Sequence, residues 1–218
     1  MTNKQTGCEI MNGPFPYDML TDEQYKTYLK RIHPQSGSTN DEKIEACGAL
    51  GRFMNPKAVE HIAAAIKHEI GLPPLGDLGV ESNERDELRK SSLIYAMIKC
   101  VQPNHIPVLI ELIESTKDDS YVALLDGLRL CSNRAWMQND ESSAKRVAVY
   151  LSNLATNGSH SFRHSARRTL LDMALGMEKE GLYLVKEEIH HVISFLKSSS
   201  DTTAQIYAVR FSDVIQNI

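Results

Sequence analysis

The stretch from Asp41 to Ile70 limits most strongly what this chain can fold into, because its pattern predicts two short helices joined by a turn. In the first half, apolar and small residues recur with helical spacing: Ile44, Ala46, Cys47, Ala49 and Leu50. In the second half, the same spacing relates Val59, Ile62, Ala63, Ile66 and Ile70. The turn is predicted at Phe53-Met54-Asn55-Pro56. A helical hairpin cannot bury its apolar seam alone, so further hairpins are expected along the chain.

Further helix pairs follow the first hairpin. Their predicted helices cover about residues 83–100, 106–115, 120–130, 142–155, 161–175, 184–196 and 202–217. Repeat starts at Asp41, Asp86, Ser120, Ser161 and Asp201 are about 34 to 45 residues apart, which is typical of two-helix repeats. Before them, Thr21 and Gln24 predict a capping box for a helix at about 21–32, and Asn40 or Asp41 is expected to cap the first hairpin.

The pattern also predicts which side chains face the core and where the repeat is interrupted. In the helix from residue 83, the expected inward side is Leu88, Ser91, Ser92, Tyr95 and Ala96; in the last helix, it is Ile206, Val209, Phe211 and Val214. The segment from Cys131 to Glu141, with the only tryptophan, Trp136, is predicted to be an irregular insertion. Gly71 to Gly79 is predicted to be a loop, either an interaction loop or a tolerated insertion.

The chain resembles the HEAT-like repeat family, most closely in IEACGALGRFMNPKAVEHIAAAI, where a small-residue helix ending in Leu-Gly is followed by Asn-Pro and an apolar helix. The resemblance spans roughly Asp41 to Leu196. It implies an all-α fold, an α-solenoid of about four irregular hairpins over residues 41–218. Residues 1–40 are expected to form an N-terminal arm and a capping helix. The resemblance implies little about activity.

Charge and hydrophobicity make some classes of partner less favoured than others. The chain has 24 Lys and Arg against 28 Asp and Glu, a formal net charge of −4, and each half has 12 basic and 14 acidic residues. Proteins that bind phosphate backbones normally show a clustered basic face, so nucleic acid is disfavoured. No apolar run is long enough to span a membrane and the start has no apolar signal-peptide core. A soluble, cytoplasmic protein without a membrane partner is expected.

The residues that could perform chemistry are isolated from one another. Cys8, Cys47, Cys100 and Cys131 form no Cys-x-x-Cys pair and are expected to be free thiols, most of them buried. His160 and His164 have a spacing that can hold a metal, but no Asp, Glu or Cys lies at a sequence spacing that would complete a metal site. No nucleophile, dinucleotide or phosphate-loop motif is present. No catalytic residue, metal or cofactor is therefore predicted, and an enzyme is less favoured than a binding protein.

The binding prediction concerns the second helix of each pair, because in solenoids these helices commonly line the concave binding face. The outward residues singled out there are Glu60, His61, Lys67, His68, Glu111, Glu114, Arg146, Tyr150, Glu187, Glu188 and His191. Their charges alternate in sign, which suits a specific protein surface better than a polyanion. We therefore expect a non-enzymatic protein-binding module, an adaptor or an inhibitor.

Two alternatives remain open from the sequence. Arg163, Arg167 and Arg168 form the densest basic patch, which suits a phosphate or an acidic partner, although pairing with an acid such as Asp172 is the other use. Some HEAT-like proteins are DNA glycosylases, phycobilin lyases or hydroxylases, so a HEAT-like enzyme or nucleic-acid-binding protein is one alternative. The hydroxylases use several His-Glu pairs, and this chain has one, at His68. The other alternative, from size and charge, is an immunity protein that neutralises a toxin.

Overall fold

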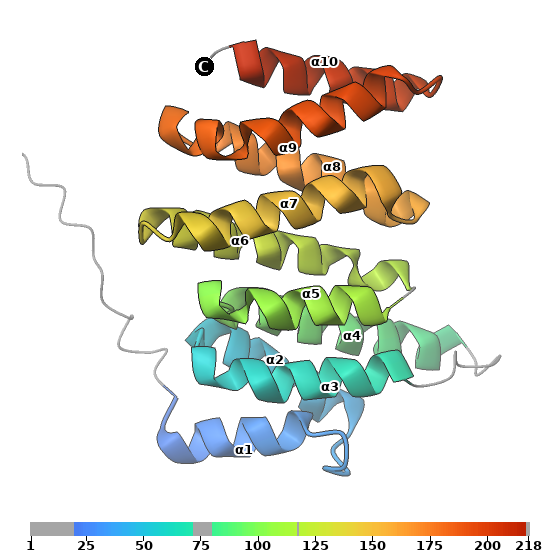
Figure 1. Cartoon of the computed structure of the whole chain (residues 1–218). Coiled ribbons are helices and arrows are strands. Elements are labelled where there is room, and N and C mark those ends of the chain that lie inside the picture. The colour runs from blue at the N-terminus through green and yellow to red at the C-terminus, as the bar shows by residue number, and fades with distance from the viewer. Residues whose placement is uncertain (1–19, 72–79, 117, 217–218) are drawn as a thin grey trace, which may run out of the picture.

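The computed structural model describes residues 20–71, 80–116 and 118–216 (Figure 1). Within these ranges the fold is all-α, as predicted: ten α-helices, three short 3-10 helices and no strand. The α-helices are α1 Asp22–Ile32, α2 Asn40–Phe53, α3 Val59–Gly71, α4 Val80–Cys100, α5 Ile106–Ser115, α6 Leu124–Met137, α7 Glu141–Asn157, α8 His160–Leu175, α9 Lys179–Lys197 and α10 Thr202–Gln216. The 3-10 helices are η1 Pro56–Ala58, η2 Pro103–His105 and η3 Asp119–Ala123.

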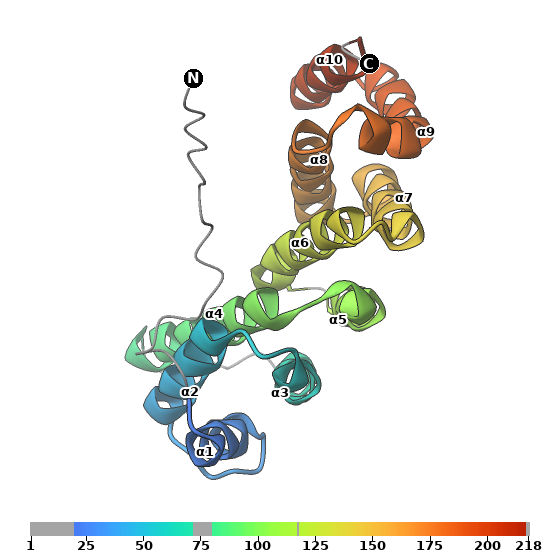
Figure 2. The same cartoon turned by 90° about the vertical axis from the view of Figure 1, so that its left-hand side faces the viewer.

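The helices are stacked in chain order as two layers. Figure 2 shows α2, α4, α6, α8 and α10 in one layer and α3, α5, α7 and α9 in the other, with α1 covering the N-terminal end. The stack bends toward the side of α4, α6 and α8, so the layer of α3, α5, α7 and α9 lies on the outer side of the bend. One apolar core runs between the two layers from Ile32 to Val214.

The first hairpin forms as predicted. Leu50 of α2 and Ile62 and Ile66 of α3 are completely buried between the helices. Met54 ends α2 in the left-handed conformation, with φ of 50°, and the Asn55 side chain accepts from the Lys57 backbone N–H at 3.0 Å to begin η1. The turn therefore reverses the chain over two residues and turns the apolar sides of both helices toward each other.

The helix caps confirm one prediction and correct another. At α1, Thr21 Oγ1 accepts from the Gln24 N–H at 3.2 Å and the Gln24 side chain accepts from the Thr21 N–H at 2.9 Å, which completes the predicted capping box. At α2 the cap is Thr39, which pairs in the same way with Glu42, and neither Asn40 nor Asp41. The Asn40 side chain instead contacts Arg89 and Asp86 of α4.

The predicted inward side of α4 is wrong except at Ala96, which is buried as expected. Leu88 and Tyr95 are 55% and 43% exposed, whereas the buried side comprises Leu93, Ile94, Ala96, Met97 and Cys100. The polar residues Asp86 and Arg89 precede this buried side in helical register and are themselves turned inward. A hydrophobic pattern cannot detect an inward face that begins with a charged pair, which explains the rotated prediction.

The last helix is also rotated relative to its prediction. Phe211 and Val214 are buried as expected, but Ile206 and Val209 are 51% and 61% exposed. Their inward positions are taken by Ala204, Tyr207 and Ala208. Since α10 ends the described stack, it has neighbours on only part of its surface, namely α8 and α9.

The segment predicted as an insertion belongs mostly to a helix. Helix α6 continues through Trp136 to Met137, and only residues 138–140 separate it from α7. The Trp136 ring packs against Gly181 near the start of α9, where an added Cβ would lie 3.2 Å from the ring. The predicted loop at Gly71 to Gly79 and the predicted arm, Cys8 included, lie outside the described residues, except that Gly71 ends α3 and Leu20 precedes α1.

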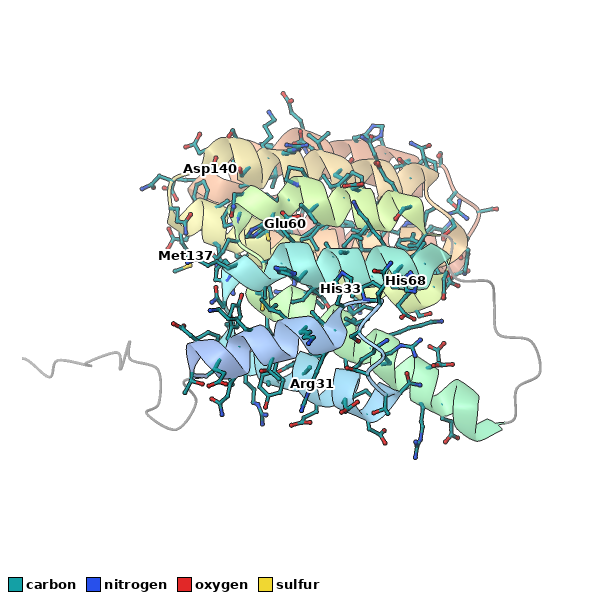
Figure 3. The ribbon with its side chains drawn as sticks, turned by 90° about the horizontal axis from the view of Figure 1, so that it is seen from below. Arg31, His33, Glu60, His68, Met137 and Asp140 are labelled. Atoms are coloured by element: carbon teal, nitrogen blue, oxygen red, sulfur yellow. The ribbon has the colours of Figure 1, made fainter. Side chains whose placement is uncertain are left out.

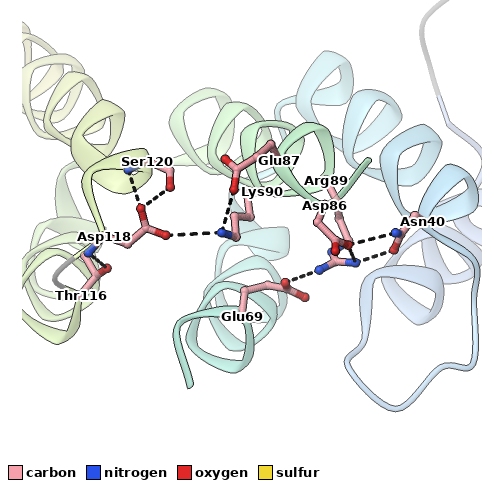
Figure 4. A network of polar contacts seen from close by, with 9 residues as sticks. All are labelled: Asn40, Glu69, Asp86, Glu87, Arg89, Lys90, Thr116, Asp118 and Ser120. Atoms are coloured by element: carbon pink, nitrogen blue, oxygen red, sulfur yellow. Dashed lines mark hydrogen bonds and ion pairs between the residues drawn. The ribbon is translucent and has the colours of Figure 1, made fainter. Parts of the chain in front are cut away.

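A buried polar network fastens α2, α3 and α4 together (Figure 4). The Arg89 guanidinium donates to Glu69 at 2.5 Å and to Asp86 at 2.8 Å, and it also donates to the Asn40 side chain. The side chains of Arg89, Glu69 and Asp86 are only 7–11% exposed. A buried cation needs such partners because its desolvation is costly. The network therefore fixes the register of the first two helix pairs, and the sequence pattern did not reveal it.

Candidate interaction surfaces

The residues singled out for binding lie on the outer layer formed by α3, α5, α7 and α9. Nine of them are exposed: Glu60, His61, Lys67, His68, Glu111, Glu114, Arg146, Glu187 and His191. Tyr150 and Glu188 are half-buried. Figure 3 shows Glu60 and His68 near opposite ends of α3. We call these eleven residues the outer face. They share one layer, but the bend in Figure 2 places that layer on its outer side, whereas the expectation was the concave side.

Parts of the outer face are already engaged within the molecule. Lys67 of α3 and Glu111 of α5 form an ion pair at 2.6 Å. The Tyr150 hydroxyl and one carboxylate oxygen of Glu188 are buried and have no hydrogen-bond partner among the described residues. Burial is the largest cause that raises the pKa of Tyr150, and the Glu114 carboxylate raises it further. The phenol therefore stays protonated near neutral pH and keeps a hydrogen to donate.

The opposite layer exposes more large apolar side chains. We define the apolar face as Leu88 and Tyr95 of α4, Met137 of α6, Leu175 of α8, and Ile206 and Val209 of α10, which are 43–82% exposed. Each of these helices packs on its neighbours and on the other layer, so its remaining exposed stripe points away from the stack. Among the described residues, the outer layer exposes two such side chains, Val149 and Tyr183.

Charges of both signs accompany the apolar face. Arg168 lies 3.8 Å from Asp172 on α8, and Arg129 lies 3.6 Å from Asp126 on α6. The pairing of an arginine of the basic patch with Asp172, one of the two uses predicted for it, is confirmed for Arg168. The Arg168–Asp172 pair is exposed, and an exposed pair of this kind contributes little to stability.

The three arginines predicted as one patch do not form one. Arg168 is 76% exposed in its side chain and points outward, whereas Arg167 is only 7% exposed and its Nε donates to the Ala155 carbonyl at 3.1 Å. Consecutive helical residues are turned by about 100°, which separates these two guanidinium groups. Arg163 and Arg167 instead line a cavity of about 610 Å³ together with His160, His164, Phe195, Ser199, Asp201 and Thr203.

The buried cysteines have thiols of low reactivity. Cys47, Cys100 and Cys131 are free thiols, and burial raises the pKa of Cys47 and Cys131 to about 12 and that of Cys100 to about 11. They are therefore protonated near neutral pH, and a protonated thiol is a poor nucleophile. Over the described ranges, no group of three or more His, Cys, Asp or Glu is placed to hold a metal ion.

No protein-family model, curated protein or solved structure matches this chain. None of the helices in the described ranges is both long and apolar enough to cross a membrane.

Proposed function

We propose that the protein is a HEAT-like α-solenoid that binds another protein, without catalysing a reaction, and that the apolar face is the contact surface. The observation that supports this proposal is the exposure of six large apolar side chains on α4, α6, α8 and α10, the alternate helices that form one layer. Single exposed apolar residues are normal on protein surfaces. Their recurrence on α4, α6, α8 and α10 is typical of a surface that becomes covered.

The side chains of the apolar face also indicate the chemistry of the partner. Tyr95 offers an aromatic ring with Lys99 Nζ 5.5 Å from its centroid, and Leu88 lies two turns earlier on the same helix. The ion pair of Arg168 with Asp172 flanks this surface on α8. A matching partner has apolar side chains between charges of both signs, which describes a protein surface better than a nucleic acid.

The outer face is the competing surface. Its predicted residues are mostly charged, and Lys67 and Glu111 already neutralise each other. Desolvating such groups on binding costs free energy that apolar burial does not. We therefore favour the apolar face and use the outer face as the comparison.

A pull-down from cell lysate with face-specific variants tests the proposal. Leu88→Ser with Leu175→Ser should release a bound protein that the unchanged chain retains after nuclease treatment. Replacing Glu111, Glu114, Glu187 and Glu188 by alanine should leave that protein bound. Loss of the partner from the second variant and retention by the first would contradict the apolar face. Far-ultraviolet circular dichroism of both variants checks that the helices remain folded.

We also propose that binding takes place in the cytoplasm. Cys47, Cys100 and Cys131 are unpaired in the folded chain. Unpaired cysteines are usual in a reducing compartment, whereas secreted proteins tend to pair theirs in disulfides.

A further inference from the structure

A basic cavity lies between α8 and the connection from α9 to α10. On the α8 side it is lined by His160, Arg163, His164 and Arg167. These four residues occupy positions i, i+3, i+4 and i+7, so they share one side of the helix. The other wall consists of Phe195, Ser199, Asp201 and Thr203. Asp201 is the single acid among the lining residues, and it faces two arginines and two histidines.

Arg167 is a buried cation that forms no ion pair within the described ranges. It is 7% exposed, and its Nε donates to the Ala155 carbonyl at 3.1 Å. Within the described ranges its two terminal amino groups donate to no residue, and neither Arg167 nor Arg163 forms an ion pair. Burial is the main cause that lowers the pKa of Arg167; the positive charge of Arg163 lowers it further, and Asp201 opposes both. An anion in the cavity would relieve this unfavourable arrangement.

The nearby acids direct their hydrogen bonds to groups other than the two arginines. One Asp201 carboxylate oxygen accepts from the Thr203 backbone N–H at 2.9 Å and so caps α10. Asp119 accepts from the Ser161 hydroxyl at the start of α8, which already compensates the positive end of that helix. The attraction for an anion therefore comes from the side chains of the cavity and not from the helix dipole.

We infer that this cavity binds a phosphorylated small molecule, with its phosphate on Arg163 and Arg167. Guanidinium groups present paired donors that match phosphate oxygens. The cavity volume of about 610 Å³ lies in the range of small-molecule pockets and exceeds what one phosphate needs. Phe195 then forms an apolar wall for the organic part of the ligand. None of the six residues that define the apolar face lines this cavity.

Isothermal titration calorimetry of the full chain with inorganic phosphate and with phenyl phosphate tests the site. The ionic strength is held constant so that charge screening does not change. We expect saturable binding at one site, with phenyl phosphate the tighter ligand because of Phe195. Absence of saturable binding for both ligands at millimolar concentration would overturn the proposal, and equal affinity would remove Phe195 from the site.

Two arginine variants on the same helix provide the matched comparison. Arg163→Gln should weaken phenyl phosphate binding by about 10-fold or more, the effect of losing a charge-assisted hydrogen bond. Arg168→Gln should leave binding unchanged, since Arg168 pairs with Asp172 outside the cavity. Equal weakening by both variants would mean that only overall charge matters and would overturn the site. Arg167→Gln should act like Arg163→Gln, and if it fails to fold, Arg163→Gln decides.

Asp201→Asn gives a result of opposite sign. Asparagine caps helices as well as aspartate does, so the start of α10 should be preserved. The substitution removes the one negative charge among the lining residues. Phenyl phosphate should therefore bind more tightly than to the unchanged chain, whereas weaker binding would contradict the placement of the phosphate beside Asp201.

Discussion

His105 shows how burial of one side chain links stability to pH. It lies at the end of η2, is 9% exposed, and its Nδ1 accepts from the Gln102 backbone N–H at 3.0 Å. That contact needs an unprotonated Nδ1. Burial is the larger cause that lowers the pKa of His105 below its ordinary value of 6.5, and the negative charge of Glu60 opposes it only in part. The folded state therefore favours the neutral ring.

The first prediction concerns the pH dependence of stability. Below pH 6.5 the unfolded chain takes up a proton at His105 that the folded chain resists. The contribution of neutral His105 to the free energy of unfolding should thus be fully present above this pH. It should decrease as the pH falls toward the lowered pKa of the folded state. Urea denaturation at several pH values measures this slope. The His105→Gln variant should have a smaller slope, and an unchanged slope would show that His105 does not contribute.

At the scale of elements, the Arg89 network explains both why α4 is oriented as it is and why its face was predicted wrongly. Arg89 holds Glu69 of α3 and Asp86 of α4 in a site that is nearly closed to solvent. Removing one partner of a buried ion pair leaves an uncompensated charge. The network therefore determines which side of α4 turns to the core.

Arg89→Met should destabilise the fold by about 3–5 kcal/mol, because Glu69 and Asp86 would remain buried without a cation. Adding Glu69→Gln and Asp86→Asn should recover part of this loss, since neutral amides cost less to bury than carboxylates. Chemical denaturation of the three proteins measures the differences. Full stability of Arg89→Met would show that the network is not needed for folding.

A second comparison at this scale separates a core leucine from a surface leucine. Leu50 is completely buried in α2, and Leu88 of α4 is 55% exposed. Leu50→Ala should cost about 2–5 kcal/mol through lost burial and a cavity. Leu88→Ala should change stability by less than about 0.5 kcal/mol. Similar losses of stability for both variants would show that Leu88 is buried, as the hydrophobic pattern of the sequence predicts for α4. The melting temperatures of the two variants provide an independent check.

The sequence predicted those elements whose signals are local. The capping box at Thr21, the turn before Pro56 and the bounds of α5 depend on neighbouring residues, and the structure confirms them. The facing sides of the first hairpin follow from the sequence because the residues between its two helices, such as Leu50, Ile62 and Ile66, are apolar and recur with helical spacing. In α4 the inward side begins with Asp86 and Arg89, whose partners Asn40 and Glu69 are distant in the chain. A periodicity argument cannot supply such partners.

The cavity and the apolar face cannot be predicted from the sequence alone, because each combines residues from several helices. The sequence singles out Arg163 and Arg167, but Ser199 and Thr203 come from another helix pair and have no signal of their own. Adjacency in sequence groups Arg168 with the other two arginines, although the helix turns it by about 100° from Arg167 and away from the cavity. The hydrophobic pattern assigns Ile206 and Val209 to the core, because it cannot distinguish a buried apolar residue from an exposed one in the last helix of the stack.

At the scale of the whole molecule, the bend gives the two layers different surroundings. The apolar face lies on the layer of α4, α6, α8 and α10, and the mostly charged outer face lies on the other layer (Figure 2). Exposed apolar area on neighbouring helices of one layer becomes favourable only when it is covered. The central proposal is that a partner protein covers the apolar face.

Hydroxyl-radical footprinting of the chain, alone and bound to the partner recovered in the pull-down, tests this proposal most directly. The radicals modify exposed side chains, and the two faces offer matched probes: Tyr95, Met137 and Leu175 on the apolar face, and Val149 and Tyr183 on the outer layer. The proposal predicts that binding protects the first three and leaves the last two reactive. Protection of Val149 and Tyr183 with undiminished labelling of Met137 and Leu175 would contradict it.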